Sequence, residues 1–494
     1  MRRFIAIAML CFSFALAQSG TLEIAVDQSP VGLDPHLVTA FSSFQVIGQI
    51  YEGLLEVNAD LQLEPALAES FTVSSSGLSY TFDLRDGVAF HNGRALTSDD
   101  VVYSFERVMA EETGSPQASR FSQVATVVAT DPDTVVFTLS EAFAPFLSNL
   151  PNLSIVPQEV VEANGDLQQV AVGTGPFMLA EVVPDTFTLL EANPNYYREG
   201  EPGVAALRYN VVPEASTRSA GLRTGSYHLM PVVDPATAET LRGASGITML
   251  ETQDLAYSLV GINTTRAPLT NSDVRRAINL AIDREEIVEA VYFGNAVPGG
   301  PLSPGLSDWA LDISEYPCYQ HAAAAAKALL AGVGAEGLEL EILAFGTLQV
   351  VSDLAQVVQA QLNDAGFNAT VNIEEFGTFV QRWRNSDFDV FVSLNGGNID
   401  PDGYLNRTFH TGGSTNVFLY SDAQVDALLD AGRTNTDFAA RQDIYRQLQH
   451  LLACDGPIAH VAYGTLFTAH RDEVEGFQQI PTRGLRYLRN LTLR

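Results

Sequence analysis

The alternation of apolar and polar positions along the chain predicts short strands and helices that follow one another without a long linker. Runs with apolar residues at every second position indicate strands, and runs with apolar residues three or four positions apart indicate helices. Strands are expected at 22–26, 78–84 and 134–139, and helices at 42–54 and 215–222. The mixture of both patterns favours an α/β protein.

The most regular pattern lies between residues 338 and 394. Strands at 338–345, 367–375 and 388–394 alternate with helices at 351–362 and 376–384. Such a βαβαβ unit is right-handed, and the carboxyl ends of its parallel strands meet at one edge of the sheet. Because ligands of open α/β sheets collect at that edge, we expect a binding loop directly after the third strand.

Three other segments carry recognisable local signals. Gly173–Pro176 predicts a sharp reversal, and we place a subdomain boundary there. The run 273–292 predicts one long amphipathic helix. Asp400–Gly403, of sequence DPDG, is typical of a turn.

Composition limits the class of protein. The 494 residues are 46% hydrophobic and 17% charged, so the chain can bury a large core and is expected to form two or three domains. The formal net charge of −32 predicts a surface that repels nucleic acid and anionic lipid. We therefore expect no nucleic-acid partner.

The first seventeen residues have the features of a signal peptide. Arg2 and Arg3 precede an apolar core at 4–16, and Ala15–Ala17 is a small-residue cleavage pattern. We expect the mature chain to start at Gln18 in the periplasm or outside the cell. A lipid anchor at Cys11 is the alternative, but bulky Leu10 stands where a lipoprotein signal needs a small residue.

Two cysteines, Cys318 and Cys454, follow the predicted cleavage site. In an oxidising compartment an even pair indicates a disulfide, which would close a long loop and stabilise the fold by roughly 4–5 kcal/mol in the chain-entropy model. Two separate buried thiols are the alternative, because sequence does not measure the distance between them.

Searches for catalytic and cofactor motifs give little. Gly332–Gly337 matches G-x-G-x-x-G, yet it follows a helical run and precedes a strand, the reverse of the order that phosphate binding needs. G-x-S-x-G, H-E-x-x-H and P-loop motifs are absent. The eight histidines are scattered, and His91 precedes an Asn-Gly turn. We therefore expect no catalytic residue, no cofactor and no metal site.

Several segments in a fixed order resemble the family 5 extracellular solute-binding proteins of ABC importers. The most specific is the stretch 51–109, in which an apolar run, a Gly77 turn, a strand, an Asn92-Gly93 turn and a capped helix follow one another. Further segments that match in family order are GLDPH at 32–36, GTGPF at 173–177, NPNYY at 193–197, the run 273–292, NGGNIDPDGYL at 395–405 and the run 440–461.

The resemblance implies an α/β, periplasmic-binding-protein-like fold of type II, large cluster C, with two lobes, an extra subdomain and a hinge. The crossing between the lobes is expected at 261–266, with Gly175, Ile262, Asn263 and His470 as hinge residues. The implied division is signal peptide 1–17, lobe I 18–57, extra subdomain 58–175, lobe I again 176–262, lobe II 263–469 and a lobe I return 470–494.

Ligand-facing positions carried over from the family fall in three segments. They are Val31, Gly32, Asp34, Gln117, Phe121, Leu394, Asn395, Gly396, Gly397, Asn398 and Asp400. Peptide-binding members have a Trp and an Asp in the last loop, and here Leu394 and Gly397 stand in their places. Glycine offers no carboxylate to a peptide ammonium. Either Asp400 takes over this role, or the ligand is not a peptide with a free amine.

The expected function is capture of a di- or oligopeptide-like solute between the lobes and its delivery to an ABC permease in the membrane, by a monomer. The glycines and amides at 395–398 also suit neutral polar groups, so modified peptides, opines, oligosaccharides and chelated nickel stay open as ligands. The rivals are a secreted hydrolase, which needs two acids roughly 5–10 Å apart, and a chemosensory module with the same fold.

Overall fold

The computed structural model describes residues 20–494. The predicted signal peptide 1–17, with its cleavage after Ala17, and Cys11 lie outside the described residues. Among the described residues, no helix combines the length and the apolar character needed to cross a membrane.

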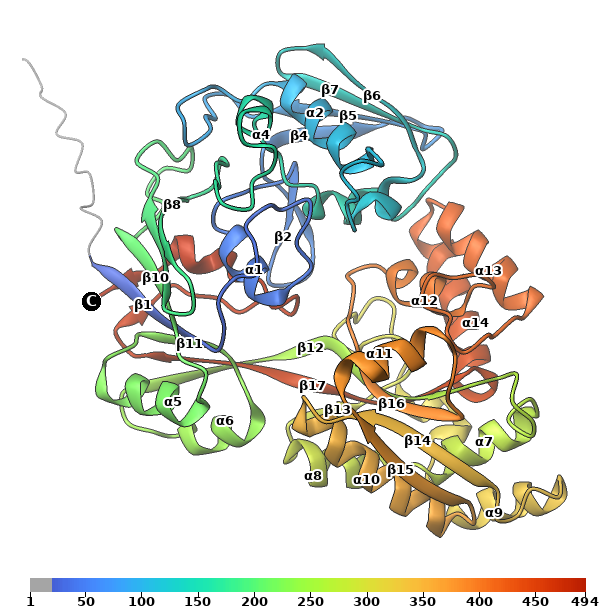
Figure 1. Cartoon of the computed structure of the whole chain (residues 1–494). Helices are drawn as coiled ribbons and strands as arrows, with labels where there is room; N and C mark the ends of the chain where they lie inside the picture. The colour runs from blue at the N-terminus through green and yellow to red at the C-terminus, as the bar shows by residue number, and fades with distance from the viewer. Residues whose placement is uncertain (1–19) are drawn as a thin grey trace, which may run out of the picture.

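One sheet of eleven strands runs through the whole molecule. Two long strands, β12 (Ile247–Ile262) and β17 (Ile458–Arg471), pair antiparallel in its middle and extend from one half of the molecule into the other (Figure 1). On one side of this pair the sheet continues as β16, β14 and β15, and on the other side as β11, β1, β10, β9 and β8. The two sides form lobe II and lobe I.

Lobe I is built from three separate parts of the chain. Its core joins residues of β1, of α1, of β8–β10 and of the last twenty residues, among them the fully buried Leu22, Leu207 and Leu488. The elements are β1 (Thr21–Val26), α1 (Phe41–Ile47), α4 (Gln158–Asn164), β8 (Phe177–Val183), β9 (Phe187–Ala192), β10 (Ala206–Val211), α5 (Ala215–Thr224), β11 (Leu229–Val233), α6 (Pro235–Leu241), β18 (Val474–Glu475), η5 (Arg486–Asn490) and β19 (Thr492–Leu493).

The extra subdomain has its own sheet and its own core. The strand order β4-β5-β7-β6 is antiparallel, and α2 begins with a capping box in which Thr97 and Asp100 satisfy each other's backbone N–H groups. A cluster of phenylalanines fills the core. Strand β2 (Leu55–Val57) is the last element of the first lobe I segment and pairs with β3 (Leu63–Pro65) of the subdomain. The other subdomain elements are β4 (Ala68–Val73), β5 (Ser79–Leu84), α2 (Ser98–Met109), η1 (Ala118–Phe121), β6 (Val124–Asp131), β7 (Thr134–Leu139), α3 (Phe146–Asn149) and η2 (Leu150–Asn152).

Lobe II contains the predicted βαβαβ unit. Strands β14 (Glu339–Phe345), β15 (Asn368–Glu374) and β16 (Val390–Asn395) pair in parallel around β14, with α10 (Gln349–Asp364) and α11 (Phe376–Arg384) between them. The prediction for this unit is confirmed. The other elements are α7 (Ser272–Ala281), α8 (Arg284–Tyr292), β13 (Ala296–Pro298), η3 (Ile313–Glu315), η4 (Pro317–Tyr319), α9 (Ala323–Gly332), α12 (Pro401–Phe409), α13 (Ala423–Thr434) and α14 (Phe438–Asp455).

Three local predictions were wrong. The helix expected at 42–54 ends at Ile47. The helix expected at 273–292 is two helices, because Ile282 is extended and the Asp283 side chain caps a new helix by accepting from Glu286 N. The turn expected at 400–403 is the start of α12, with Asp400 as its N-cap.

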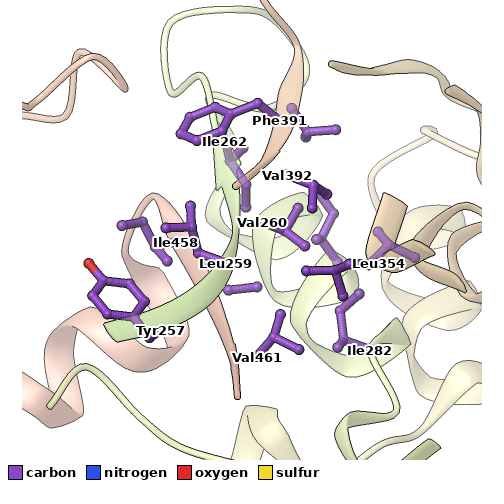
Figure 2. Packing of buried hydrophobic residues seen from close by; sticks show 14 of the residues in the cluster. Tyr257, Leu259, Val260, Ile262, Ile282, Leu354, Phe391, Val392, Ile458 and Val461 are labelled. Atoms are coloured by element: carbon purple, nitrogen blue, oxygen red, sulfur yellow. The ribbon is translucent and has the colours of Figure 1, made fainter. Parts of the chain in front are cut away.

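The crossing between the lobes does not lie at 261–266. Ile262 pairs with Val390 of β16 and packs in the lobe II core (Figure 2), and Asn263 N donates to Asp389 O. Both residues lie inside lobe II because β12 first passes between the lobes and then continues within lobe II until it ends. The expectation that they are hinge residues is therefore corrected.

The other two predicted hinge residues lie inside lobe I. His470 pairs with Leu229 of β11, and Gly175 N donates to Ile50 O. A Cβ on Gly175 would lie 2.5 Å from Gln49 O, so glycine is required there by close packing within the lobe. Neither residue lies where the chain passes between lobes.

Cys318 and Cys454 are joined by a disulfide with a Cα–Cα distance of 5.6 Å. The bond ties the η4 turn to the end of α14, within a small buried cluster that includes Tyr316 and Tyr319. The alternative of two separate thiols does not describe this structure.

Candidate functional site

A cleft of about 730 Å³ lies between the lobes. Its walls come from every part of the fold: α1 and the residues after it, the subdomain, the loop after β16, β12 itself and the residues that precede and form η5. Small ligands usually bind in clefts at the interface between two domains. We therefore take this cleft as the candidate functional site.

The floor of the cleft is an irregular part of β12. Gln253 pairs with Thr465 and Tyr257 pairs with Tyr463, so three residues of β12 oppose the single residue Gly464. The Gln253 amide donates to the backbone oxygens of Tyr463 (3.1 Å) and Gly464 (2.8 Å) and so holds the bulge in place. The structure thus places the crossing between the lobes here.

The three bulged residues of β12 line the cleft, and the middle one contacts lobe II. The three are Asp254, Leu255 and Ala256. Leu255 O accepts a hydrogen bond from the Tyr404 hydroxyl at 2.7 Å. A Cβ on Gly397 would lie 2.2 Å from Leu255 Cβ and 2.4 Å from Leu255 O. No side chain fits at position 397 unless the crossing strand moves.

The loop after β16 lies in the cleft as expected. Leu394, Asn395, Gly396, Gly397 and Asn398 all line it. The Asn395 amide nitrogen donates to the Tyr257 hydroxyl at 2.8 Å, and Asn398 Oδ1 accepts from Asp400 N at 3.0 Å. The loop is therefore held in place by its own hydrogen bonds, while its glycines leave backbone groups open to the cleft.

Residues Val31, Gly32 and Asp34 do not line the cleft. Val31 is 80% exposed, and a Cβ on Gly32 would lie 1.9 Å from the side-chain oxygen of Gln168. Asp34 is fully buried in an ion pair with Arg107, at 2.6 Å between Oδ2 and Nη2. Burial opposes its charged form, but the hydrogen bonds and charge of Arg107, together with the backbone N–H groups of Leu167 and His36, lower the pKa of Asp34. Asp34 holds its loop together.

Phe121 and Asp400 are also structural residues. Phe121 is fully buried in the subdomain core. Asp400 caps α12 and forms a two-pronged ion pair with Arg441, with distances of 2.9 and 3.1 Å. Both oxygens of Asp400 are engaged, so the hypothesis that Asp400 replaces the missing ammonium anchor is not supported by its geometry.

The predicted residue Gln117 does line the cleft, and next to it lies Arg120, which the sequence analysis did not single out. The Gln117 side-chain oxygen is buried without a hydrogen-bond partner within residues 20–494. Arg120 N donates to Gln117 O at 3.0 Å, so one turn presents both side chains. Burial, and next the positive charge of Arg407, lower the pKa of Arg120.

Glu56, on the lobe I side of the cleft, belongs to a dense ion network. Arg489 donates to both of its oxygens, at 2.8 and 2.9 Å, and Arg198 and Arg486 lie at 3.1 and 3.2 Å. Burial alone would raise the pKa of Glu56, but the hydrogen bonds and charges of these arginines lower it to about 2. Glu56 is therefore charged, and both of its oxygens are already engaged by arginines rather than open to a ligand.

Glu52, which precedes β2 in the chain, is engaged by neutral donors. Its oxygens accept from Thr174 Oγ1 at 3.0 Å, Tyr196 OH at 2.8 Å and Tyr197 OH at 3.0 Å. Burial raises the pKa of Glu52, although these hydrogen bonds and the nearby Arg489 act in the opposite direction. This carboxyl therefore anchors the NPNYY segment to lobe I.

Asp254 in the crossing bulge is the third acid of the cleft wall. It forms an ion pair with Arg483 from the residues before η5, and its Oδ1 also accepts from Ala256 N at 3.0 Å. All three acids that line the cleft within the described part of the chain are thus engaged by other residues. Sequence reasoning missed Glu52, Glu56 and Asp254 because their partners lie far away in the chain.

Within residues 20–494, no three His, Cys, Asp or Glu side chains lie together in a way that could hold a metal ion. The histidines that are fully buried have structural partners. His36 Nε2 donates to Ser154 O at 2.8 Å while Nδ1 faces Arg107, and burial lowers the pKa of His36 to about 4.

Two lobes joined by paired strands, with a cleft floored by those strands, define the class of two-lobed solute-binding proteins. Residues 62–416 match the family described as bacterial extracellular solute-binding proteins, family 5. The chain belongs to this family. The predicted family and the predicted α/β, type II two-lobed fold are confirmed.

Similar proteins span nearly the whole chain. A probable di/tripeptide-binding protein of Pseudomonas aeruginosa is 30% identical, with 94% of each chain covered. The structure of the oligopeptide-binding protein AppA from Bacillus subtilis, in complex with a nonapeptide, superposes with a TM-score of 0.82 at 25% identity and covers 97% of this chain and 99% of that one. AgaA from A. tumefaciens, in complex with agropinic acid, gives 0.81 at 26% identity, with 96% and 99% covered.

Proposed function

We propose that this protein is the solute-binding component of an ABC importer, which captures a peptide-like solute between its lobes and presents it to a membrane permease. The observation that carries the proposal is the cleft of about 730 Å³, which is lined by both lobes and floored by the strands that join them. A ligand in this position contacts both lobes at once, and family membership supports an uptake role.

The mechanism is binding without chemistry. A ligand that contacts both lobes favours the closed arrangement by the difference between its affinities for the closed and open forms. We propose that closure bends β12 at Gln253–Tyr257 and β17 at 463–465, where the strand pairing is already irregular. The acids of the cleft are engaged in ion pairs or hydrogen bonds, and this supports a role other than hydrolysis.

Peptide-like chemistry fits the polar groups that remain open. The unpartnered oxygen of Gln117 can accept an amide N–H, and the backbone at Gly396 can contact amide groups directly. The di/tripeptide-binding relative and the nonapeptide-bound structure support the same class. A non-peptide solute is the second candidate, since position 397 excludes any carboxylate and a related structure holds agropinic acid.

Export and oligomeric state are proposed together with this function. We expect the secreted protein to begin at Gln18, which N-terminal sequencing would check, and to behave as a monomer. A start at Cys11 with a lipid attached would contradict the cleavage site.

The test combines ligand discovery with a measure of closure. Mass spectrometry of solutes released from gently denatured protein would identify what the protein carries, and small-angle scattering with and without that solute would report compaction. We expect a peptide-like solute, micromolar or tighter binding and a smaller radius of gyration when it is bound. Turnover of the solute, or binding with no change in shape, would overturn the proposed mechanism.

A further inference from the structure

The cleft carries positive charge in a strongly acidic protein. The whole chain has a net charge of −32, yet the residues that line the cleft include three carboxylates and four guanidiniums. The carboxylates Glu52, Glu56 and Asp254 are all engaged, and three of the four arginines are engaged with Glu56 and Asp254. The fourth, Arg120, forms no ion pair and no side-chain hydrogen bond within residues 20–494.

A second arginine, Arg407, lies behind the opposite wall and contacts two residues that line it. Arg407 belongs to α12, which Figure 1 shows on the side of lobe II that faces the subdomain. One of its terminal nitrogens donates to Asn395 Oδ1 at 3.1 Å and to Gly396 O at 3.3 Å, two residues that line the cleft. Its Nε is buried with no partner in the described part of the chain, and it forms no ion pair there.

Arg120 lines the cleft from the subdomain, and Arg407 holds the lobe II loop that lines the opposite side. Arg120 sits in the subdomain turn η1, and its charge is close enough to that of Arg407 for the two to oppose each other. Like charges without a counter-ion raise the free energy of an empty closed cleft. A bound anion removes this repulsion and gains charge-assisted hydrogen bonds from both sides.

We propose that the solute carries an oxyanion, a carboxylate or a phosphate, which is held between Arg120 and Arg407 and joins the subdomain to lobe II. This inference rests on the proposed solute-binding function and specifies its ligand class. The Gln117 oxygen lies on the same turn as Arg120, so an N–H close to the anionic group can be bound as well. An acylated amino acid or peptide with a free terminal carboxylate has both groups.

The same geometry assigns no partner to a free ammonium group. Position 397 has no room for a side chain, Asp400 is committed to Arg441, and the acids of the cleft wall are engaged. An N-terminal ammonium would also be repelled by Arg120 and Arg407. We therefore expect that removing the ligand's positive charge leaves affinity unchanged or improves it, while removing its negative charge weakens binding by at least about tenfold.

Calorimetry with matched probes tests the inference, using protein that has been unfolded and refolded to remove bound solute. The probes are dipeptides in three forms, unmodified, N-acetylated and C-amidated, together with non-peptide carboxylic acids and sugar phosphates. We expect the forms with a free carboxylate or phosphate to bind at least about tenfold more tightly than the amidated form. If only the non-peptide carboxylic acids or only the sugar phosphates bind tightly, the natural solute is assigned to that class of compound.

Variants of Arg120 and Arg407 test whether these two residues bind the anion. Arg120→Gln and Arg407→Gln should each weaken the binding of the anionic probes by about tenfold or more. Arg120→Lys should keep part of the affinity that Arg120→Gln loses. A dipeptide that is both N-acetylated and C-amidated carries no charge and should bind all variants equally. Arg446→Gln, on the exposed face of α14, is the matched control and should bind like the wild type. Unfolding midpoints show that each variant is folded.

The outcomes separate this inference from the proposed function. If amidated and free forms bind equally well, or if Arg120→Gln binds anionic probes like the wild type, the anion site is overturned while solute binding stands. If no probe binds the wild type at millimolar concentration, both the solute-binding proposal for this chemistry and the anion site are overturned.

Discussion

The two walls of the cleft use arginine in opposite ways. On the lobe I wall, Arg489 and Arg486 surround Glu56, and every charge has a partner within 3.2 Å. On the wall formed by the subdomain and lobe II, Arg120 and Arg407 have no carboxylate partner among the described residues. The comparison separates charges that hold the fold together from charges that are left available for a ligand.

The difference follows from how the chain is connected. Glu56 and Arg489 are 433 residues apart, and their ion pair fastens the C-terminal return to the first part of lobe I within one rigid body. Arg120 and Arg407 belong to bodies that the proposed hinge allows to separate, so a direct partner across the cleft would hold it shut. Substitutions on the two walls should therefore have opposite effects on stability and binding.

The largest expected effect is on the paired wall. Glu56→Gln removes the carboxylate that Arg489, Arg486 and Arg198 share and leaves Arg489 with Glu201 alone. Removing one partner of a buried ion pair typically costs about 3–5 kcal/mol of unfolding free energy. Denaturant unfolding measures this loss. Glu69→Gln, at an exposed position on β4, is the control and should change stability by less than about 0.5 kcal/mol. A Glu56 variant as stable as this control would show that the network does not hold lobe I together.

Acidification should weaken the buried structural groups. Burial lowers the pKa of His36 to about 4 and of His460 to about 3, so the unfolded chain takes up protons below pH 6.5 while these native side chains stay neutral. Their contribution is complete above pH 6.5 and is lost as pH falls through these values, on the order of a few kcal/mol. Below pH 4.5 Glu56, with its pKa of about 2, adds to the loss.

Thermal unfolding between pH 8 and pH 3 checks this prediction. The midpoint should be flat above about pH 7 and should fall steadily below pH 6.5. His36→Gln should flatten the upper part of the slope, whereas exposed His450→Gln should not. A midpoint that rises on acidification to pH 5 would contradict the assignment of neutral buried histidines.

Between the two walls, Gly397 tests the contact of lobe II with the crossing strand. Gly397→Asp places atoms into Leu255 and should cost about 1–3 kcal/mol, as overpacking usually does, and weaken solute binding because the loop must move. Gly396→Asp is the control for stability alone, since a Cβ there meets nothing within 4 Å. Denaturant unfolding of both variants and calorimetry of Gly397→Asp measure these effects. A tolerated Gly397→Asp with new affinity for free-amine peptides would show that the loop adapts.

The smallest expected stability effect is on the unpaired wall. Arg120→Gln removes a charge that has no partner and is opposed by Arg407, so the unfolding free energy should stay within about 0.5 kcal/mol of the wild type or rise slightly. The same denaturant titration measures it. A loss comparable to that of Glu56→Gln would place Arg120 among the structural residues and remove the contrast between the walls.

Local patterns in the sequence predicted the regular parts of the fold. The βαβαβ unit at 338–394 was found because each of its strands and helices has a clean periodicity and ends at a turn. The break at Ile282 was missed because the apolar spacing of 273–292 suits one helix, and only the local cap at Asp283 divides it. The crossing was placed too late because β12 carries the same strand pattern through both lobes.

The candidate site was predictable only where binding depends on local sequence. The loop 394–398 was found from its position after the third strand, and Gln117 from the family resemblance. Asp34 and Asp400 were mistaken for ligand residues because their ion partners, Arg107 and Arg441, are remote in the chain. An arginine without a partner, such as Arg120, becomes visible only when all neighbours are known in space.

The composition of the lobe I core constrains the order in which the protein can mature. The lobe II core is drawn from one continuous stretch, from Leu255 to Tyr463, so that half can assemble once this stretch has been synthesised. Lobe I needs Leu488 and Leu491, which follow the whole of lobe II in the sequence, to cover its earliest strand. The lobe whose strand comes first is thus the last to be completed, and a chain cut before Leu485 would hold a finished lobe beside an open one.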